Sequence, residues 1–115
     1  MSAVAFILED EPIIALDIED LLLQFGCSDA KVFSTADQAL RWLDSNTPDF
    51  AIIDPLLKDG YCTTVAALLS ERSVPFIVYS GNNAAELTSE FRMGIMVLKP
   101  AAPDELLDVV KSILG

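Results

Sequence analysis

The sequence predicts an α/β domain built on a doubly wound parallel sheet. Three observations lead to this prediction: five short apolar segments recur along the chain, each is followed by residues with helical spacing, and the connections between them are short. Continuous apolar runs of four to six residues indicate strands that are buried on both faces. Regular alternation of strand and helix indicates parallel strands, right-handed crossovers and helices on both faces of the sheet. We expect residues 1–115 to form one domain.

The expected strands are bounded by turn formers or polar residues. The most apolar of them runs straight into Asp54 and Pro55, whereas the second is short and weak, which suits the edge of a sheet. We predict the strand order 2-1-3-4-5, one of the two common doubly wound orders and that of flavodoxin-like (βα)5 three-layer sandwiches. In chain order the expected strands are Ala3–Leu8, Lys31–Phe33, Phe50–Ile53, Pro75–Tyr79 and Ile95–Leu98.

The expected helices combine apolar residues at helical spacing with recognisable start and stop residues. Pro12 is tolerated at a first helical position and Gly26 closes the same helix. Ser34 or Thr35 can cap the second helix. The fourth helix has a sparse apolar stripe, so we expect it to be short and mobile. The expected helices run from Pro12 to Phe25, from the Ser34 or Thr35 cap to Leu43, from Thr63 to Arg72, from Asn82 to Arg92 and from Pro103 onward.

Charge and composition exclude several classes of function. Lys and Arg total 7 against 18 Asp and Glu, a net charge of -11, so binding to nucleic acid or to an anionic membrane is not expected. No apolar run approaches the roughly 20 residues of a membrane span, and Met1–Ala3 show no basic leader, so we expect a cytoplasmic protein. The chain has no His, and Cys27 and Cys62 lack C-x-x-C spacing. Two buried structural thiols are therefore expected.

Four of the five expected strands end, at one edge of the sheet, in a residue that can bind phosphate or metal. These residues are Glu9 and Asp10, Asp54, Ser80 and Lys99. Neighbouring carboxylates repel one another, so without a cation a pKa should rise or the loops should loosen; Mg²⁺ or Mn²⁺ would relieve the repulsion. Asp54 can act as a nucleophile that forms an aspartyl phosphate, while Lys99 and Ser80 bind the phosphoryl oxygens. Each residue alone also has an ordinary structural explanation, and only their coincidence favours a site.

This set, Glu9-Asp10, Asp54, Ser80 and Lys99-Pro100, resembles the receiver domain of two-component response regulators over essentially the whole chain. The resemblance implies a signalling protein in which a histidine kinase phosphohistidine, or a phosphotransfer protein, donates a phosphoryl group to Asp54. Such a domain catalyses its own phosphorylation and dephosphorylation but is not a conventional turnover enzyme. Phosphorylation would alter binding of a downstream partner at the face of the fourth and fifth strands and the helices that follow them. Homodimerisation is left open.

The resemblance also implies a role for each residue of the site. Asp10, Asp54 and the backbone carbonyl of Leu56 would hold Mg²⁺ (or Mn²⁺), and Glu9 would orient a bound water. Ser80 would follow the phosphoryl group as a switch residue, Lys99 would take the basic position, and the Lys99-Pro100 peptide would be cis.

Two departures from the family pattern stand out. Met96 occupies the place three residues before the lysine where most receivers carry Tyr or Phe, so a switch at Met96 would lack a defined pair of aromatic rotamers. Pro55 removes a backbone N–H directly after the acceptor. The segment from Pro75 to Gly81 is also similar to an α-proteobacterial group of single-domain receivers that carry a Phe-Ala-Thr-Gly-like motif.

Three other functions remain to be weighed. A receiver that no longer accepts phosphate could act as a constitutive protein-docking module, and the two departures keep that alternative open. A flavin or nucleotide carrier would need a neutral loop after the first strand, whereas Glu9–Glu11 would repel phosphate. A haloacid-dehalogenase-like phosphatase would need an Asp-x-Asp pair at that same place, which the chain lacks.

Overall fold

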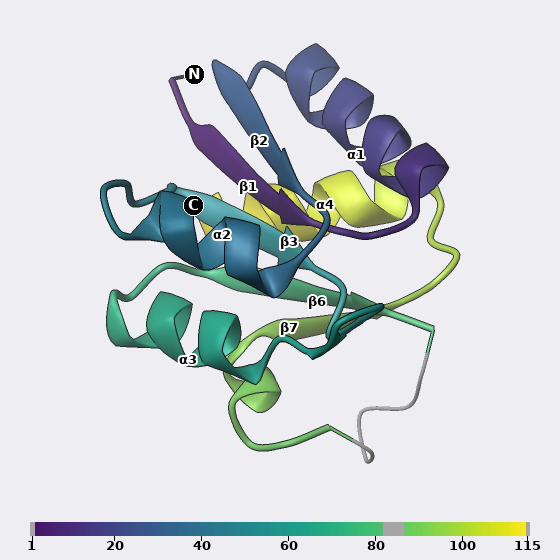
Figure 1. Cartoon of the computed structure of the whole chain (residues 1–115). Coiled ribbons are helices and arrows are strands. Elements are labelled where there is room, and N and C mark those ends of the chain that lie inside the picture. The colour runs from purple at the N-terminus through teal and green to yellow at the C-terminus, as the bar shows by residue number, and fades with distance from the viewer. Residues whose placement is uncertain (1, 82–86, 115) are drawn as a thin grey trace.

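The computed structural model describes residues 2–81 and 87–114. Its main sheet has five parallel strands in the order β2-β1-β3-β6-β7 (Figure 1), which confirms the predicted fold class and strand order. The weak second strand does lie at an edge, and it is two residues longer than expected. The strands are β1 (Val4–Leu8), β2 (Asp29–Phe33), β3 (Phe50–Ile53), β6 (Phe76–Ser80) and β7 (Ile95–Leu98).

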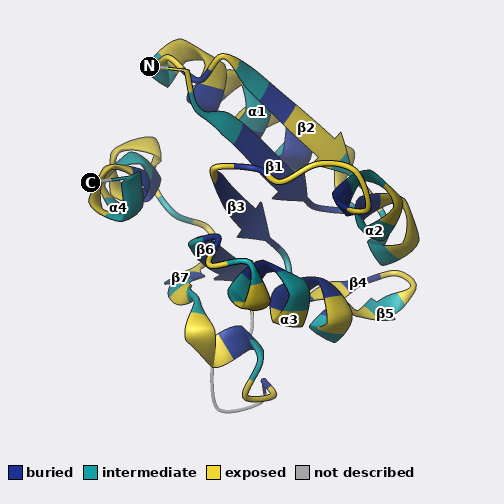
Figure 2. Ribbon diagram, turned by 90° about the vertical axis from the view of Figure 1, so that its left-hand side faces the viewer, coloured by how far each residue is buried: buried dark blue, intermediate teal, exposed yellow. Residues whose placement is uncertain are grey.

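Two apolar layers lie against opposite faces of this sheet. Alternate residues of a strand point to opposite faces, so Phe6 and Leu8 of β1 join one core cluster while Ala5 and Ile7 join the other. All four residues of β3 are buried, as a central strand covered on both faces requires. The dark blue β3 and β6 ribbons at the centre of Figure 2 show the same burial.

Four α-helices cover the sheet in the described part of the chain. Residues of α1 and α4 pack with one core cluster, and residues of α2 and α3 pack with the other, which makes three layers. The predicted caps are present: Pro12 opens α1, Gly26 closes it at φ 118°, and the Thr35 hydroxyl accepts a hydrogen bond from the Gln38 N–H. The helices are α1 (Pro12–Phe25), α2 (Ala36–Leu43), α3 (Thr63–Glu71) and α4 (Pro103–Leu114).

Two predictions about the connections need correction. Of the helix expected from Asn82 to Arg92, residues 82–86 lie outside the described residues, and the described remainder contains a single 3-10 turn, η2 (Phe91–Met93), in place of an α-helix. Its sparse apolar stripe buries only Leu87 and Phe91 in the described part. The connection between β3 and α3, in which no strand was expected, contains a small hairpin, where β4 (Leu56–Leu57) pairs with β5 (Gly60–Tyr61) in antiparallel fashion.

Among residues 2–81 and 87–114, the structure contains no helix with both the length and the apolar character needed to cross a bilayer. Cys27 and Cys62 are both buried and form no disulfide, which confirms the expected burial of two free thiols.

Candidate functional site

Three carboxylates meet where β1 and β3 end side by side. Glu9 and Asp10 follow β1, Asp54 follows β3, and one oxygen from each lies within 4.8 Å of the others. The pairing of Leu8 with Ile53 in the parallel ladder places these residues at the same edge, as the sequence predicted. Glu9 is almost fully buried, whereas Asp10 and Asp54 are partly exposed. A hollow of about 440 Å³ opens beside Glu9 and Asp10, toward α1 and the start of α2.

Lys99 reaches into this cluster from the end of β7. Its ammonium Nζ lies 2.6 Å from Glu9 Oε1 and 2.7 Å from Asp54 Oδ2, with little of the side chain exposed. Burial alone would lower the pKa of Lys99, but the hydrogen bonds to Asp54 and Glu9 together raise it above its ordinary value. Burial raises the pKa of Glu9, and the bond from Lys99 only partly opposes that rise.

A backbone N–H also holds each of the three carboxylates. Glu9 Oε2 accepts from Glu11 N at 3.1 Å, Asp54 Oδ1 from Leu56 N at 3.0 Å, and Asp10 Oδ2 from Lys58 N at 2.7 Å. These donors and Lys99 offset much of the repulsion between the acids. A raised pKa was expected from charge repulsion, yet for Glu9 burial is the largest cause and the charge of Asp54 the smallest.

Ser80 ends β6 within the same edge, next to Lys99. Ser80 is 1% exposed, and its carbonyl accepts a hydrogen bond from the Lys99 backbone N–H at 2.9 Å. Met96 pairs with Val78 across the β6–β7 ladder and packs, partly buried, against the core cluster under α2 and α3. The structure therefore places Ser80 at the same edge of the sheet as the carboxylates, whereas Met96 lies one or more residues deeper within the sheet. The Lys99-Pro100 peptide is cis, as the resemblance implied.

Two residues that sequence reasoning did not assign to the site shape the loop after Asp54. Lys58, at the turn of the β4–β5 hairpin, holds Asp10 through its backbone N–H. Cys62 follows the hairpin; its thiol donates to the Asp54 carbonyl at 3.3 Å and its N–H to the Pro55 carbonyl at 3.0 Å. The turn is Lys58-Asp59, and Gly60 follows it at φ 111°, so a glycine directly after this polar pair is the sequence signal that could have predicted the hairpin.

We expect both cysteines to resist thiol reagents in the folded protein. Burial, and then the charge of Asp54, raise the pKa of Cys62 to about 12, and burial also raises the pKa of Cys27. The reactive thiolate is therefore scarce, and reagent access is blocked. A chromogenic disulfide reagent at pH 8 should titrate no thiol until denaturant is added and two thereafter, since the chain has two cysteines. Fast reaction of one thiol without denaturant would contradict this prediction.

The donor atoms of the cluster fit a small hard cation. The cluster offers carboxylate oxygens from three residues at mutual distances suited to one ion, and partial exposure of Asp10 and Asp54 leaves room for water ligands. Mg²⁺ and Mn²⁺ favour such oxygen sets completed by water. The backbone of Leu56 lies next to the cluster, because its N–H donates a hydrogen bond to Asp54 Oδ1. The cluster contains no His or Cys.

Fold and site together define a class of protein: a five-stranded doubly wound α/β domain with an acidic cluster and a partly buried lysine at the carboxyl edge of its sheet. The chain belongs to the response regulator receiver domain family, whose model matches residues 5–111. It is thus a receiver domain of two-component signalling.

Solved structures of similar proteins agree with this membership. SdrG from Sphingomonas melonis Fr1 shares 30% identity, with 99% of this chain and 98% of that chain covered and a TM-score of 0.83. A BeF3-activated conformation of SdrG, attributed to Pseudomonas melonis Fr1, shares 31% identity over all of both chains, with a TM-score of 0.80. The response regulator PhyR from Brucella abortus shares 25% identity; 99% of this chain matches 48% of that chain with a TM-score of 0.83. A comparison with curated protein sequences gives no significant match.

Proposed function

We propose that this receiver accepts a phosphoryl group on Asp54 from the phosphohistidine of a histidine kinase or phosphotransfer protein, in a reaction that depends on Mg²⁺. The observation that carries the proposal is the position of Asp54, whose carboxylate lies within 4.8 Å of two further acids and 2.7 Å from the Lys99 ammonium. A nucleophilic carboxylate with a cation-binding set and a fixed ammonium beside it suits phosphoryl transfer, which depends mainly on positioning and charge stabilisation.

In the transfer, an Asp54 carboxylate oxygen attacks phosphorus, and the P–N bond to the donor imidazole breaks. The imidazole nitrogen keeps the electron pair of that bond and leaves as neutral histidine once it carries a proton. Bound Mg²⁺, held by Asp10, Asp54 and the Leu56 carbonyl with Glu9 orienting a water, would neutralise charge on the phosphoryl oxygens. Hydrolysis of the aspartyl phosphate by water then releases inorganic phosphate and restores the carboxylate.

In this proposal two existing contacts change as the reaction proceeds. The Lys99 ammonium, now bound to Asp54 Oδ2, would move to a phosphoryl oxygen. The Lys58 N–H, now bound to Asp10 Oδ2, would yield when that oxygen binds a cation. Ser80, at the end of β6, would follow the phosphoryl group and bias the surface around β6, β7 and α4 toward a different partner.

We expect acetyl phosphate with Mg²⁺ to add one phosphoryl group to the wild-type chain and none to an Asp54→Asn variant, because the amide is not a nucleophile. Intact-protein mass spectrometry would measure the addition. Asp59→Asn is the matched control, since Asp59 is an exposed acid in the hairpin of the same loop. Phosphorylation that survives Asp54→Asn, or that disappears equally in Asp59→Asn, would contradict the assignment.

The alternative is a receiver that docks constitutively and takes up no phosphate. It is favoured by the hydrogen bonds that already hold all three carboxylates without a cation. Calorimetric titration separates the two functions: Mg²⁺ binding in the millimolar range, lost in Asp10→Asn, supports phosphoryl transfer. No heat of binding up to that range, together with no uptake from acetyl phosphate, would support the docking module.

A further inference from the structure

Tyr79 is a buried aromatic residue directly beside the candidate site. It precedes Ser80 on β6, so its side chain lies on the opposite face of the sheet, in the core cluster that α1 and α4 cover. It is 7% exposed. Met96 lies toward the other face, so Tyr79 is not a displaced version of the aromatic that most receivers carry there.

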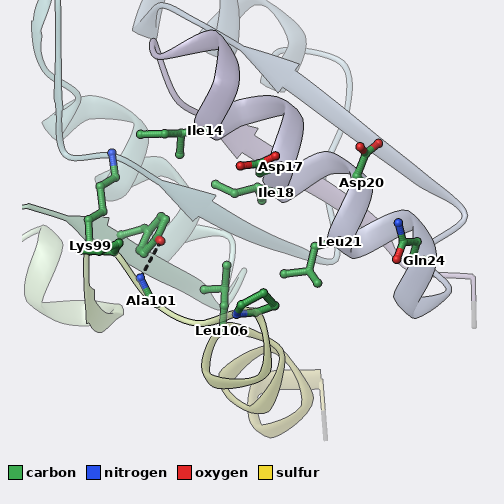
Figure 3. A pocket seen from close by; sticks show the side chains of 12 residues that line it. Ile14, Asp17, Ile18, Asp20, Leu21, Gln24, Lys99, Ala101 and Leu106 are labelled. Atoms are coloured by element: carbon green, nitrogen blue, oxygen red, sulfur yellow. Dashed lines mark hydrogen bonds between the residues drawn. The ribbon is translucent and has the colours of Figure 1, made fainter.

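The Tyr79 side chain contacts the lysine loop at two points. Its hydroxyl oxygen accepts a hydrogen bond from the Ala101 N–H at 3.0 Å, the dashed line that ends at Ala101 in Figure 3. The Lys99 Nζ lies 5.5 Å from the centroid of its ring, within the range of a cation–π contact. One side chain therefore contacts both the ammonium of Lys99 and the backbone of Ala101.

Successive residues of β6 thus hold the backbone on either side of Lys99. The Ser80 carbonyl accepts the Lys99 N–H at 2.9 Å, and Tyr79 accepts the Ala101 N–H. Pro100, between them, has no N–H, so Ala101 is the first residue after the lysine that can donate to an anchor. Without the Tyr79 hydroxyl, the chain after Lys99 would lose this fixed point.

We propose that Tyr79 is a positioning residue that holds Lys99 in place for phosphoryl transfer at Asp54. The inference rests on the proposed function and names a residue that supports the same site. The hydroxyl fixes the backbone after the lysine, and the ring face adds a weak attraction that keeps the ammonium over the carboxylates. Such preorganisation lowers the free-energy barrier of phosphoryl transfer, because the lysine side chain is already in position before the reaction begins.

The position of Tyr79 also connects the site to a cavity on the other side of the sheet. Tyr79 and the loop Lys99–Ala101 form one wall of a cavity of about 610 Å³ between α1 and α4. The opposite wall, on α1, carries Ile14, Ile18 and Leu21, as Figure 3 shows. Because Tyr79 and Lys99 line this cavity together, a repacking of α1 against α4 would change the surroundings of both residues.

The kinetic test uses two substitutions of Tyr79 and one control. Tyr79→Phe keeps the ring and removes the hydroxyl, whereas Tyr79→Leu removes both contacts. Phe50→Leu is the control, because Phe50 is fully buried in the same core cluster but lies at the opposite end of the sheet. We expect the rate of phosphorylation at saturating acetyl phosphate to fall roughly threefold in Tyr79→Phe, which loses one weak contact. It should fall roughly tenfold in Tyr79→Leu, which loses two. It should stay within twofold in Phe50→Leu.

The half-saturating Mg²⁺ concentration separates positioning from a general loss of structure. It should change less than about twofold in both Tyr79 variants, because a residue that acts on Lys99 alone leaves the cation-binding set intact. If Tyr79→Leu slows phosphorylation no more than Phe50→Leu, Tyr79 is only a core residue and the proposal is wrong. Failure of the wild-type chain to take up phosphate would instead overturn the proposed function.

A spectroscopic test does not depend on phosphorylation. In the wild-type chain the Ala101 amide should be protected from hydrogen exchange, and the Lys99 side-chain protons nearest the ammonium should show a ring-current shift. Tyr79→Phe should remove the protection but keep the shift, and Tyr79→Leu should remove both, while Phe50→Leu keeps both. A wild-type spectrum with neither signature would overturn the positioning role.

Discussion

Lys99→Met should destabilise the cation-free protein by about 3 kcal/mol or more near neutral pH. The substitution leaves the Glu9 carboxylate, which is 3% exposed, without its only charged partner among the described residues. A buried ion that loses its partner costs far more than the pair itself contributes. Urea unfolding with and without the substitution would measure the difference.

The penalty of Lys99→Met should depend on pH in a defined direction. The pKa of Glu9 already lies above 4.5 in the folded protein because of burial, and loss of the Lys99 contact raises it further. A carboxyl whose folded pKa is raised favours folding while it is protonated, below pH 4.5, and this contribution is lost as the pH rises through the folded pKa. The destabilisation should therefore be small at pH 4 and large at pH 8.

Two further variants make this expectation specific. Glu9→Gln added to Lys99→Met should recover much of the lost stability, because no charge then remains buried without a partner at that position. Lys31→Met is the matched control: its ion pair with Asp29 is about half exposed and should contribute less than about 1 kcal/mol. An equal penalty for the two lysines, or a penalty that does not change with pH, would contradict the prediction.

Gly94→Ala should destabilise the fold by about 2 to 3 kcal/mol through overpacking. A Cβ at this position would lie 2.5 Å from two ring carbons of Phe76 and 2.8 Å from the Phe76 carbonyl oxygen. The backbone at Gly94 has φ −93° and ψ 175°, a conformation that any residue adopts, so the cost comes from the clash alone. Phe76 is buried in β6 and cannot withdraw without moving the strand.

Thermal or urea unfolding of Gly94→Ala would check the magnitude. Gly81→Ala is the control, because a Cβ there meets nothing within 4 Å. Phe76→Leu should cost less in the Gly94→Ala background than alone, because the smaller side chain relieves the clash. Additive effects of these two substitutions, or equal costs for the two glycines, would show that the close packing of Gly94 does not determine stability.

The sheet and the location of the site could be predicted because both depend on local patterns. Apolar runs such as Phe50–Ile53 identify buried strands, and the residue after each run then lies at a common edge. Pro12, Gly26 and Thr35 marked helix ends through backbone chemistry that operates within a few residues. The strand order and the carboxylate cluster were therefore correct; the chemical roles of these residues stay predictions.

The contacts that hold the site together could not be predicted in the same way. Lys58 reaches Asp10 across 48 positions of sequence, through a backbone N–H that every residue except proline possesses. Tyr79 follows the pattern of a core strand residue, and nothing in that pattern reveals that its hydroxyl meets Ala101. The fourth helix was expected from a sparse stripe of apolar residues, and among the described residues only a 3-10 turn forms there.

The bond between the Lys58 amide and Asp10 links the hairpin to the acidic cluster in both directions. Suppose that a divalent ion competes with this amide for Asp10 Oδ2, and that a partner protein binds the hairpin in a position further from Asp10. The bound partner then raises the affinity of the site for the ion, and the bound ion raises the affinity for the partner by the same factor. A kinase that binds β4 and β5 would thus increase metal binding at the acidic cluster. Metal affinity measured alone and with a bound partner would then differ, with no shared contact between the two ligands.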